Sequence, residues 1–226
     1  MVRKSKQKFV DAKPKKPPLF PKTERQADYI KAVTEFQQVV VLGPAGTGKT
    51  YIAATIAADL YELGKIDRII LTRPNVSAGK SIGFFPGTLE EKMAPWMAPV
   101  IDVLNKRMEK GAYETAVKNG NIEVVPFETM RGRSFNDAFV ILDEAQNTSP
   151  HEMKMFLTRV GENCKVIING DIMQSDLHES SGLSKAIHMA KKYMLPVPVI
   201  EFEVGDIVRS ELCKAWIVAF MKEERR

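Results

Sequence analysis

The chain is poor in several features that define other classes of protein. Its 226 residues include two cysteines, Cys164 and Cys213, which stand far apart and form no C-x-x-C pair. A disulfide scaffold and a zinc-stabilised domain are therefore not expected, and the composition fits a reducing cytoplasm. No apolar run approaches the length of a membrane span, and none follows the basic N-terminus. We therefore expect neither a membrane segment nor a secretory signal.

Positive charge is concentrated at the N-terminus. Residues 1–22 hold eight Lys or Arg and one acid, so this segment carries +7 while the whole chain carries +5. The segment also holds four prolines and few apolar residues, a composition typical of disorder. We expect a tail at 1–22 and a single domain at 23–226. The tail is either a solubilising linker or an arm that binds nucleic acid by releasing counterions.

Beyond the tail, helical and strand patterns alternate. This alternation predicts an α/β fold with three α/β/α layers, in which helices cover both faces of a mainly parallel sheet. Thr23 is expected to cap the first helix, and Ser149 with Glu152 to form a capping box around Pro150. The predicted strands are 38–42, 68–72, 122–125, 139–142, 165–168 and 197–202. The predicted helices are 23–36, 51–63, 89–110 with an interruption at Pro95 and Pro99, 150–160, 183–192 and 210–222.

The most informative stretch is the octapeptide GPAGTGKT at residues 43–50, here called the glycine loop. It lies between a predicted strand and a predicted helix, which is the context that a phosphate-binding loop requires. The alternative is a chance glycine loop between strand and helix. Its glycines allow backbone N–H groups to approach phosphate oxygens. Lys49 is expected to neutralise the β- and γ-phosphates, and the Thr50 hydroxyl to hold Mg²⁺. The expected nucleotide contacts are Gly43, Pro44, Ala45, Gly46, Thr47, Gly48, Lys49, Thr50 and Tyr51.

Acidic and amide side chains follow two further predicted strands. Asp143 and Glu144 come directly after strand 139–142. Such a pair often only ends a strand, but together with a glycine loop it suits Mg²⁺ binding by Asp143 and water activation by Glu144. After strand 165–168, Gly170 permits a turn. Gln174 is a candidate to sense the γ-phosphate or position water, and Asp176 is a candidate to orient it. Taken alone, this last segment reads only as a turn.

These blocks resemble the PhoH family, a set of RecA-like ATPases similar to the motor core of superfamily-1 helicases. The resemblance covers about residues 22–222. It rests on GPAGTGKT (43–50), LTRPNVSAGKSIGFFPGTLEEKMAPW (71–96), MRGRSFNDAFVILDEAQNTSPHEMKMFLTRVG (130–161), NGDIMQSDL (169–177), SGL (181–183) and DIVRSELC (206–213). It implies a P-loop NTPase domain that uses ATP and Mg²⁺.

The resemblance assigns roles to residues that spacing alone leaves as ordinary surface positions. Gln26 matches the glutamine that recognises adenine, and Arg209 matches the arginine that reaches the γ-phosphate. An arginine there would stabilise charge in the transition state. The chain departs from the usual pattern at Ser210 and Glu211, where a His-Pro pair is common.

The resemblance also places two basic segments near a single-stranded nucleic-acid track. Their chemistry suits a grip on phosphates that ignores base sequence. The expected contacts to single-stranded RNA or DNA are Thr72, Arg73, Arg131 and Arg133. Lys80, Phe84 and Phe85 lie in a glycine-rich loop, where the aromatic pair either stacks on bases or packs beneath the loop.

The length leaves room for one RecA-like domain, whereas superfamily-1 motors close two such domains on one ATP. Arg209 must then act from a neighbouring subunit or fold back within its own. The first option predicts a homo-oligomer such as a hexameric ring.

We therefore expect an ATPase that couples hydrolysis to binding or remodelling of single-stranded nucleic acid. The alternative is an ATP-dependent switch, with slow turnover and no unwinding, that binds a protein partner. A two-metal nuclease is not indicated, because no further cluster of carboxylates stands out in the sequence.

Overall fold

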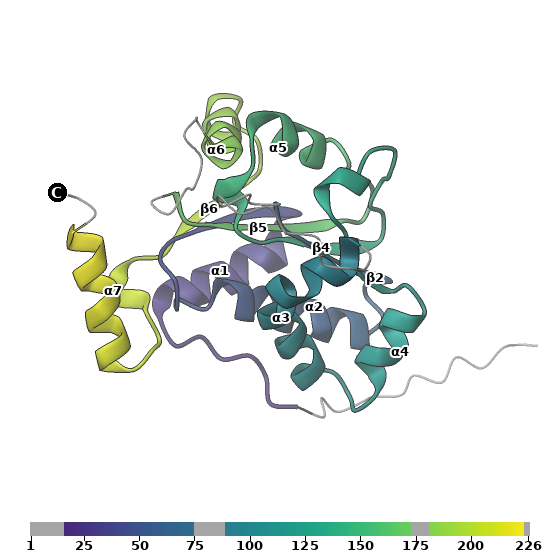
Figure 1. Ribbon diagram of the computed structural model, residues 1–226, viewed down its shortest axis with the longest axis horizontal. Coiled ribbons are helices and arrows are strands. Elements are labelled where there is room, and N and C mark those ends of the chain that lie inside the picture. Colours follow the sequence, from purple (N-terminus) through teal and green to yellow (C-terminus); the bar gives the residue numbers. More distant parts are fainter. Residues whose placement is uncertain (1–15, 75–88, 173–180, 224–226) are drawn as a thin grey trace, which may run out of the picture.

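The protein is built on one six-stranded parallel sheet (Figure 1), seen in a computed structural model that describes residues 16–74, 89–172 and 181–223. The strand order is β3-β2-β4-β5-β1-β6, and every pairing is parallel. The strands are β1 (Gln38–Leu42), β2 (Arg68–Thr72), β3 (Ile122–Val124), β4 (Ala138–Leu142), β5 (Lys165–Gly170) and β6 (Val199–Glu201). The carboxyl ends of all six strands therefore meet at one edge, where ligands bind in folds of this kind.

Helices cover both faces of this sheet, as Figure 1 shows, with α5 and α6 on one side and α1, α2 and α3 on the other. Alternate strand residues supply the two cores: Val39 and Val41 pack toward α1 and α2, and Val40 and Leu42 toward α5 and α6. The helices are α1 (Glu24–Glu35), α2 (Lys49–Glu62), α3 (Leu89–Arg107), α4 (Ala112–Lys118), α5 (Pro150–Leu157), α6 (Gly182–Lys192) and α7 (Glu211–Glu223). The predicted three-layer architecture is confirmed.

Helix starts follow the predicted capping chemistry. The Thr23 hydroxyl accepts a hydrogen bond from the Gln26 backbone N–H at the start of α1. At α5, the Ser149 hydroxyl accepts from the Glu152 N–H, while the Glu152 carboxylate accepts from the Ser149 N–H, with Pro150 at the first helical position. Both predicted caps are confirmed. Each joins residues only three positions apart, so the sequence alone could predict it.

The predicted interruption of the helix after residue 89 is wrong. α3 runs without a break from Leu89 to Arg107, with Pro95 and Pro99 inside it. The two prolines are four residues apart, so they lie one turn apart on the same side, and both are exposed. The two backbone hydrogen bonds that proline cannot donate are therefore missing on the solvent-facing side of the helix. Met97 and Leu104 hold the opposite side in the core. The short helix α4, which begins after Gly111 at a positive φ, was not predicted.

The described end of the basic N-terminal segment packs against the domain. The Lys16 ammonium donates to the last carbonyls of α3, including that of Lys106 at 2.9 Å, and Arg107 donates to the Pro17 carbonyl at 2.7 Å. Leu19 packs on the core. Residues 16–22 were assigned to a disordered tail from composition, and these contacts tie them to α3.

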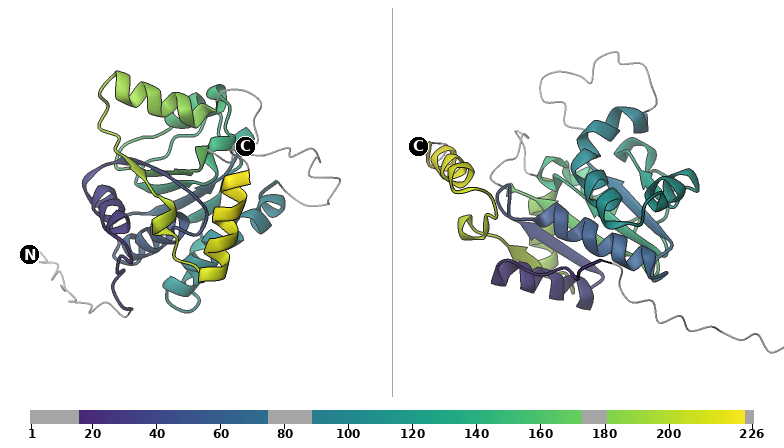
Figure 2. Two further views of the ribbon diagram at one scale, coloured as in Figure 1. Left: turned by 90° about the vertical axis from the view of Figure 1, so that its left-hand side faces the viewer. Right: turned by 90° about the horizontal axis from the view of Figure 1, so that it is seen from below.

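The last helix, α7, stands apart from the layers (Figure 1; Figure 2, right). None of its residues is buried. In the described part of the chain, no helix is both long and apolar enough to cross a membrane.

Candidate nucleotide-binding site

The glycine loop links β1 to α2 through a backbone path that requires glycine. Gly43, Gly46 and Gly48 have φ values of 133°, 85° and 91°. A Cβ at Gly43 would lie 2.6 Å from the Phe202 carbonyl oxygen, and one at Gly46 would lie 2.8 Å from Cγ of Arg209. Side chains at these positions would therefore clash with Phe202 or Arg209 and would strain the backbone of the loop.

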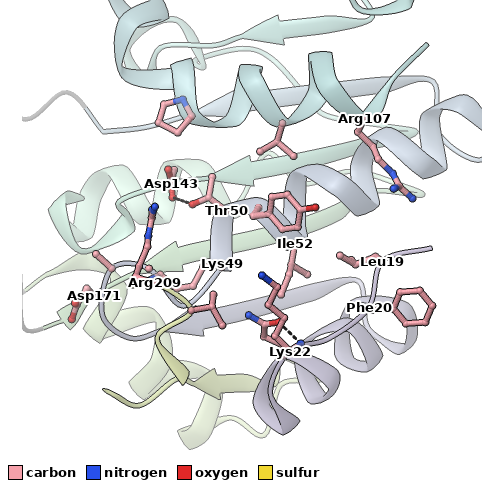
Figure 3. A pocket seen from close by; sticks show the side chains of 18 of the residues that line it. Leu19, Phe20, Lys22, Lys49, Thr50, Ile52, Arg107, Asp143, Asp171 and Arg209 are labelled. Carbon is pink, nitrogen blue, oxygen red and sulfur yellow. Dashed lines mark hydrogen bonds between the residues drawn. The ribbon is translucent and has the colours of Figure 1, made fainter. Parts of the chain in front are cut away.

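The glycine loop borders a cavity of about 600 Å³. In Figure 3, Lys49, Thr50, Asp143, Asp171 and Arg209 lie toward one end of it, and Leu19 and Phe20 toward the other. The volume falls in the range of small-molecule sites. The cavity thus joins an end rich in charged groups to an end where Leu19 and Phe20 provide apolar surface beside Arg107, which suits a nucleotide with phosphates and a base.

Thr50 and Asp143 meet at the charged end, although 93 positions separate them in sequence. The Thr50 hydroxyl donates to Oδ1 of Asp143 at 3.2 Å. The Asp143 backbone N–H donates to the Thr72 carbonyl at 2.9 Å, which fixes the carboxylate at the end of β4. Burial, and then the neighbouring Glu144 carboxylate, raise the pKa of Asp143, while the Thr50 hydrogen bond opposes the shift. A hydroxyl beside a carboxylate that is poorly solvated is a donor set that fits Mg²⁺.

Lys49 begins α2 and turns back over the glycine loop. Its ammonium donates to the carbonyls of Gly43 and Pro44, the latter at 3.0 Å. Burial lowers the pKa of Lys49, and the charges of Asp171, Asp143 and Glu144 oppose that shift. A buried cation facing these acids gains a stronger partner when phosphate oxygens enter the cavity.

Glu144 is held by a glutamine that the sequence analysis did not single out. Nε2 of Gln146 donates to Oε2 of Glu144 at 2.6 Å, and Oε1 of Gln146 accepts from the Asp171 N–H at 3.0 Å. Gln146 is 1% exposed, so this bridge between the ends of β4 and β5 is shielded from water. Glu144 itself has φ 53°, which is uncommon for a residue other than glycine. The available signal was the amide two positions after Glu144.

Arg209 lies beside the glycine loop of its own chain. The Val208 N–H donates to the Gly46 carbonyl at 2.9 Å, and Arg209 lines the cavity. Figure 3 shows its side chain at the charged end with Lys49 and Thr50. Arg209 therefore lies at the cavity of its own chain, while its action from within that chain or from a neighbouring subunit stays a prediction.

Gln26 is 4% exposed and lines the same cavity. Its Nε2 donates to the Thr47 carbonyl at 2.9 Å, and its Oε1 accepts from the Lys22 N–H at 2.8 Å. The carboxamide is therefore fixed between α1, the glycine loop and the N-terminal segment, with one N–H left over for a base. Adenine recognition by Gln26 stays a prediction.

The remaining expected nucleotide contacts divide by exposure. Thr47 is fully buried, and its hydroxyl donates to the Pro44 carbonyl at 3.1 Å, so it stabilises the loop from inside. Tyr51 is 55% exposed and lines the cavity.

Arg107 also lines the cavity, a place that the sequence analysis did not predict for it. Its guanidinium pairs with both carboxylate oxygens of Asp59 at 2.6 and 2.8 Å.

Several sequence candidates lie outside the described residues. They are Gln174 and Asp176 after β5, and Lys80, Phe84 and Phe85 between β2 and α3.

The four residues expected to contact nucleic acid do not gather. Thr72 is fully buried, whereas Arg131 is exposed. The Arg73 guanidinium lies 5.7 Å from the centroid of the Trp96 ring, near the nucleotide end of the sheet. Arg133 instead pairs with Glu123 on the edge strand β3, at 2.6 Å.

Comparison with known proteins shows the family of the chain. The sequence matches the family described as PhoH-like protein over residues 18–221. It is 45% identical over 204 residues to the PhoH-like protein of Bacillus subtilis (strain 168), across 89% of this chain and 64% of that protein. It is 44% identical over 207 residues to Protein PhoH of Escherichia coli (strain K12), across 90% of this chain and 58% of that one. The chain thus spans less than two thirds of either relative.

Among solved structures, the crystal structure of Pif1 helicase from Candida albicans is similar over 82% of this chain and 40% of that chain. Its sequence identity is 16% and its TM-score 0.43.

Proposed function

Because the chain belongs to the PhoH-like protein family, we propose that it binds and hydrolyses ATP and couples hydrolysis to the binding or remodelling of single-stranded nucleic acid. The observation that carries the proposal is the contact between Thr50 and Asp143 at 3.2 Å, in the cavity that Lys49 and Glu144 also line. Residues from the segments that follow β1 and β4 thereby meet at one point, although β5 lies between these strands.

The charged end of the cavity suits hydrolysis of the γ-phosphate. On binding, the Lys49 ammonium leaves the loop carbonyls for the β- and γ-phosphate oxygens. The Thr50 hydroxyl and the Asp143 carboxylate would hold Mg²⁺, which would supply positive charge beside the phosphates. The Glu144 carboxylate orients the attacking water and accepts its proton. Arg209 stabilises the charge that develops in the transition state.

Coupling to nucleic acid is supported by where β2 ends. Arg73 follows β2. Burial raises the pKa of Asp143, and the charge of Arg73 is among the influences that oppose this rise, so the two groups interact electrostatically. A phosphate of a bound nucleic acid that draws Arg73 away from Asp143 would change the electrostatic field where Mg²⁺ would bind. Arg131 offers an exposed cation that is free of any ion pair among the described residues.

One experiment tests this coupling: the rate of phosphate release from ATP at one stated salt concentration, with single-stranded RNA, with single-stranded DNA and with no polymer. The proposal expects stimulation by at least one polymer, weakening as salt rises. An unchanged rate with both polymers, and no displacement of a duplex, would favour a nucleotide switch that acts on a protein partner.

The position of Arg209 has its own test in mixed subunits. Arg209→Ala and Lys49→Ala chains are each expected to lose hydrolysis, and mixing them is expected to restore none, because every site needs both groups from one chain. Recovery of activity on mixing would show that Arg209 acts across a subunit boundary.

A further inference from the structure

A buried amide without hydrogen bonds lies in the middle of the sheet. Asn169, near the end of β5, is fully buried, and neither its Nδ2 nor its Oδ1 has a hydrogen-bond partner among the described residues. Burying an amide in this way is costly, because both of its polar groups give up their hydrogen bonds to water. Buried polar side-chain atoms in folded proteins nearly always have a partner, so the presence of Asn169 needs a reason.

The packing of the sheet does not require an amide at this position. Asn169 follows Ile167 on the face of the sheet that α1 and α2 cover, and its partner on β1 is Val41. On β1, β4 and β5, the buried residues that precede it on this face are apolar: Val39, Val41, Phe139, Ile141 and Ile167. A polar residue that breaks such a pattern without local compensation is typical of a functional position.

Asn169 is the neighbour of Asp143, the carboxylate expected to hold Mg²⁺. Strands β4 and β5 pair in register up to Leu142 and Ile168, so the residues that follow, Asp143 and Asn169, lie side by side. Because side chains alternate along a strand, both lie on the face that α2 covers. The Thr50 hydroxyl, in the first turn of α2, reaches Asp143 on that face (Figure 3). The unpaired amide is therefore next to the expected Mg²⁺ donors.

A carboxamide suits the surroundings of a magnesium ion. Mg²⁺ usually keeps several of its waters when a protein binds it through one or two groups and substrate phosphates. Those waters need acceptors, and a carboxylate that holds a metal is commonly oriented by a further hydrogen-bond donor. Asn169 can supply both, because Oδ1 accepts and Nδ2 donates. An amide with no other partner gains these bonds when the ion binds.

We propose that Asn169 is a positioning residue of the Mg²⁺ site: its Nδ2 donates to the Asp143 carboxylate, and its Oδ1 accepts from a water bound to the ion. The inference rests on the proposed ATP and Mg²⁺ site, and it assigns Asn169 no contact with the nucleotide. The alternative is that Asn169 holds a buried structural water whether or not Mg²⁺ is bound. In that case its substitution changes the stability of the protein but not its response to Mg²⁺.

Binding of adenylyl-imidodiphosphate, an ATP analogue that is not hydrolysed, separates these possibilities. Calorimetry on the full chain gives its Kd in Mg²⁺ and again in EDTA. Asn169→Leu and Asn169→Ala are each expected to bind it about 10- to 100-fold more weakly than the wild type in Mg²⁺, but within about threefold of the wild type in EDTA. Equal losses in Mg²⁺ and in EDTA, or no loss in Mg²⁺, would overturn the proposal.

Thermal unfolding in EDTA checks the fold of each variant. Asn169→Leu is expected to be at least as stable as the wild type, because it replaces the unpaired amide with an apolar group of similar shape. Ile167→Val is the matched control on the same face of β5, expected to lower the unfolding temperature and to leave the response to Mg²⁺ unchanged.

The wild type in the same experiment keeps this inference apart from the proposed function. A wild type that binds the analogue in neither condition would contradict the proposed ATP site itself. If the wild type binds it more tightly in Mg²⁺ and both Asn169 variants gain as much from the ion, the role of Asn169 alone is overturned.

Discussion

The residues expected to hold phosphate and those expected to hold nucleic acid behave differently in the folded chain. Lys49, Thr50 and Asp143 converge on one cavity. By contrast, Arg73 lies on Trp96, and Arg133 pairs with Glu123 on the edge strand. The difference arises because phosphate binding depends on a local backbone path that only certain residues can follow, whereas an arginine can serve any partner that its tertiary surroundings provide.

The largest effect on ATP hydrolysis is expected for the residues that converge on the cavity. Lys49→Ala should reduce ATP hydrolysis by about 10³-fold, because the ammonium balances charge on the transferred phosphoryl group. Phosphate release under saturating ATP measures this. Lys65→Ala, at an exposed position after α2, is the control and should keep wild-type turnover. Normal hydrolysis by Lys49→Ala would contradict the role of Lys49 in balancing charge on the transferred phosphoryl group.

A smaller effect is expected where the bridge that holds Glu144 is broken. Gln146→Glu keeps the size of the side chain but replaces the donated hydrogen bond with charge repulsion. We expect kcat to fall about 10- to 100-fold, with the Kd for ATP little changed, since a misplaced base costs rate rather than binding. Equal losses in kcat and in ATP affinity would point to a general structural role instead.

Substitutions of Arg131 and of Arg133 are expected to have different effects on nucleic-acid binding. Arg131→Ala is expected to weaken binding of single-stranded RNA or DNA and to lower the slope of log K against log salt by about 0.7, the loss of one phosphate contact. Arg133→Ala should leave that slope unchanged and reduce the free energy of unfolding by about 0.5–1 kcal/mol. Equal slopes for both variants would show that the ion pair to Glu123 does not distinguish these residues.

The smallest effect concerns Glu123 itself. Burial alone would raise its pKa, but hydrogen bonds and charges from Arg133 and Arg68 outweigh this and hold it below the usual value. A lowered folded-state pKa stabilises the protein above the unfolded-state pKa, and this stability is lost as pH falls through the folded-state value. Glu123→Gln should therefore cost about 0.5–1 kcal/mol at neutral pH. In thermal melts, the difference from wild type should vanish in acid; a difference that persists there would contradict the ion pair.

The sequence predicted those features that are determined by residues close to one another in the chain. The individual strands, the capping box at Ser149 and the glycine loop each depend on residues that are close in sequence. The continuity of α3 was missed, because it depends on Pro95 and Pro99 facing solvent while the opposite side is buried. No sequence pattern distinguishes an exposed proline side from a helix break.

Within the site, the sequence could not reveal pairings made by the tertiary fold. Gln146 joins Glu144 to Asp171, which follows a different strand. Gln26 is likewise fixed by Thr47 and by the N-terminal segment, which composition alone assigned to a tail. Amide side chains serve equally as surface groups or as buried bridges, and only the folded surroundings decide between these roles.

The central claim is that one chain assembles a hydrolytic site at the carboxyl edge of its sheet, with Glu144 as the group that activates water. Single-turnover hydrolysis of ATP by Glu144→Gln, with ATP binding measured on the same sample, tests it most directly. The account predicts ATP binding within about threefold of wild type and a hydrolysis rate lower by about 10²- to 10⁴-fold. Hydrolysis at the wild-type rate by the Glu144→Gln protein would contradict it.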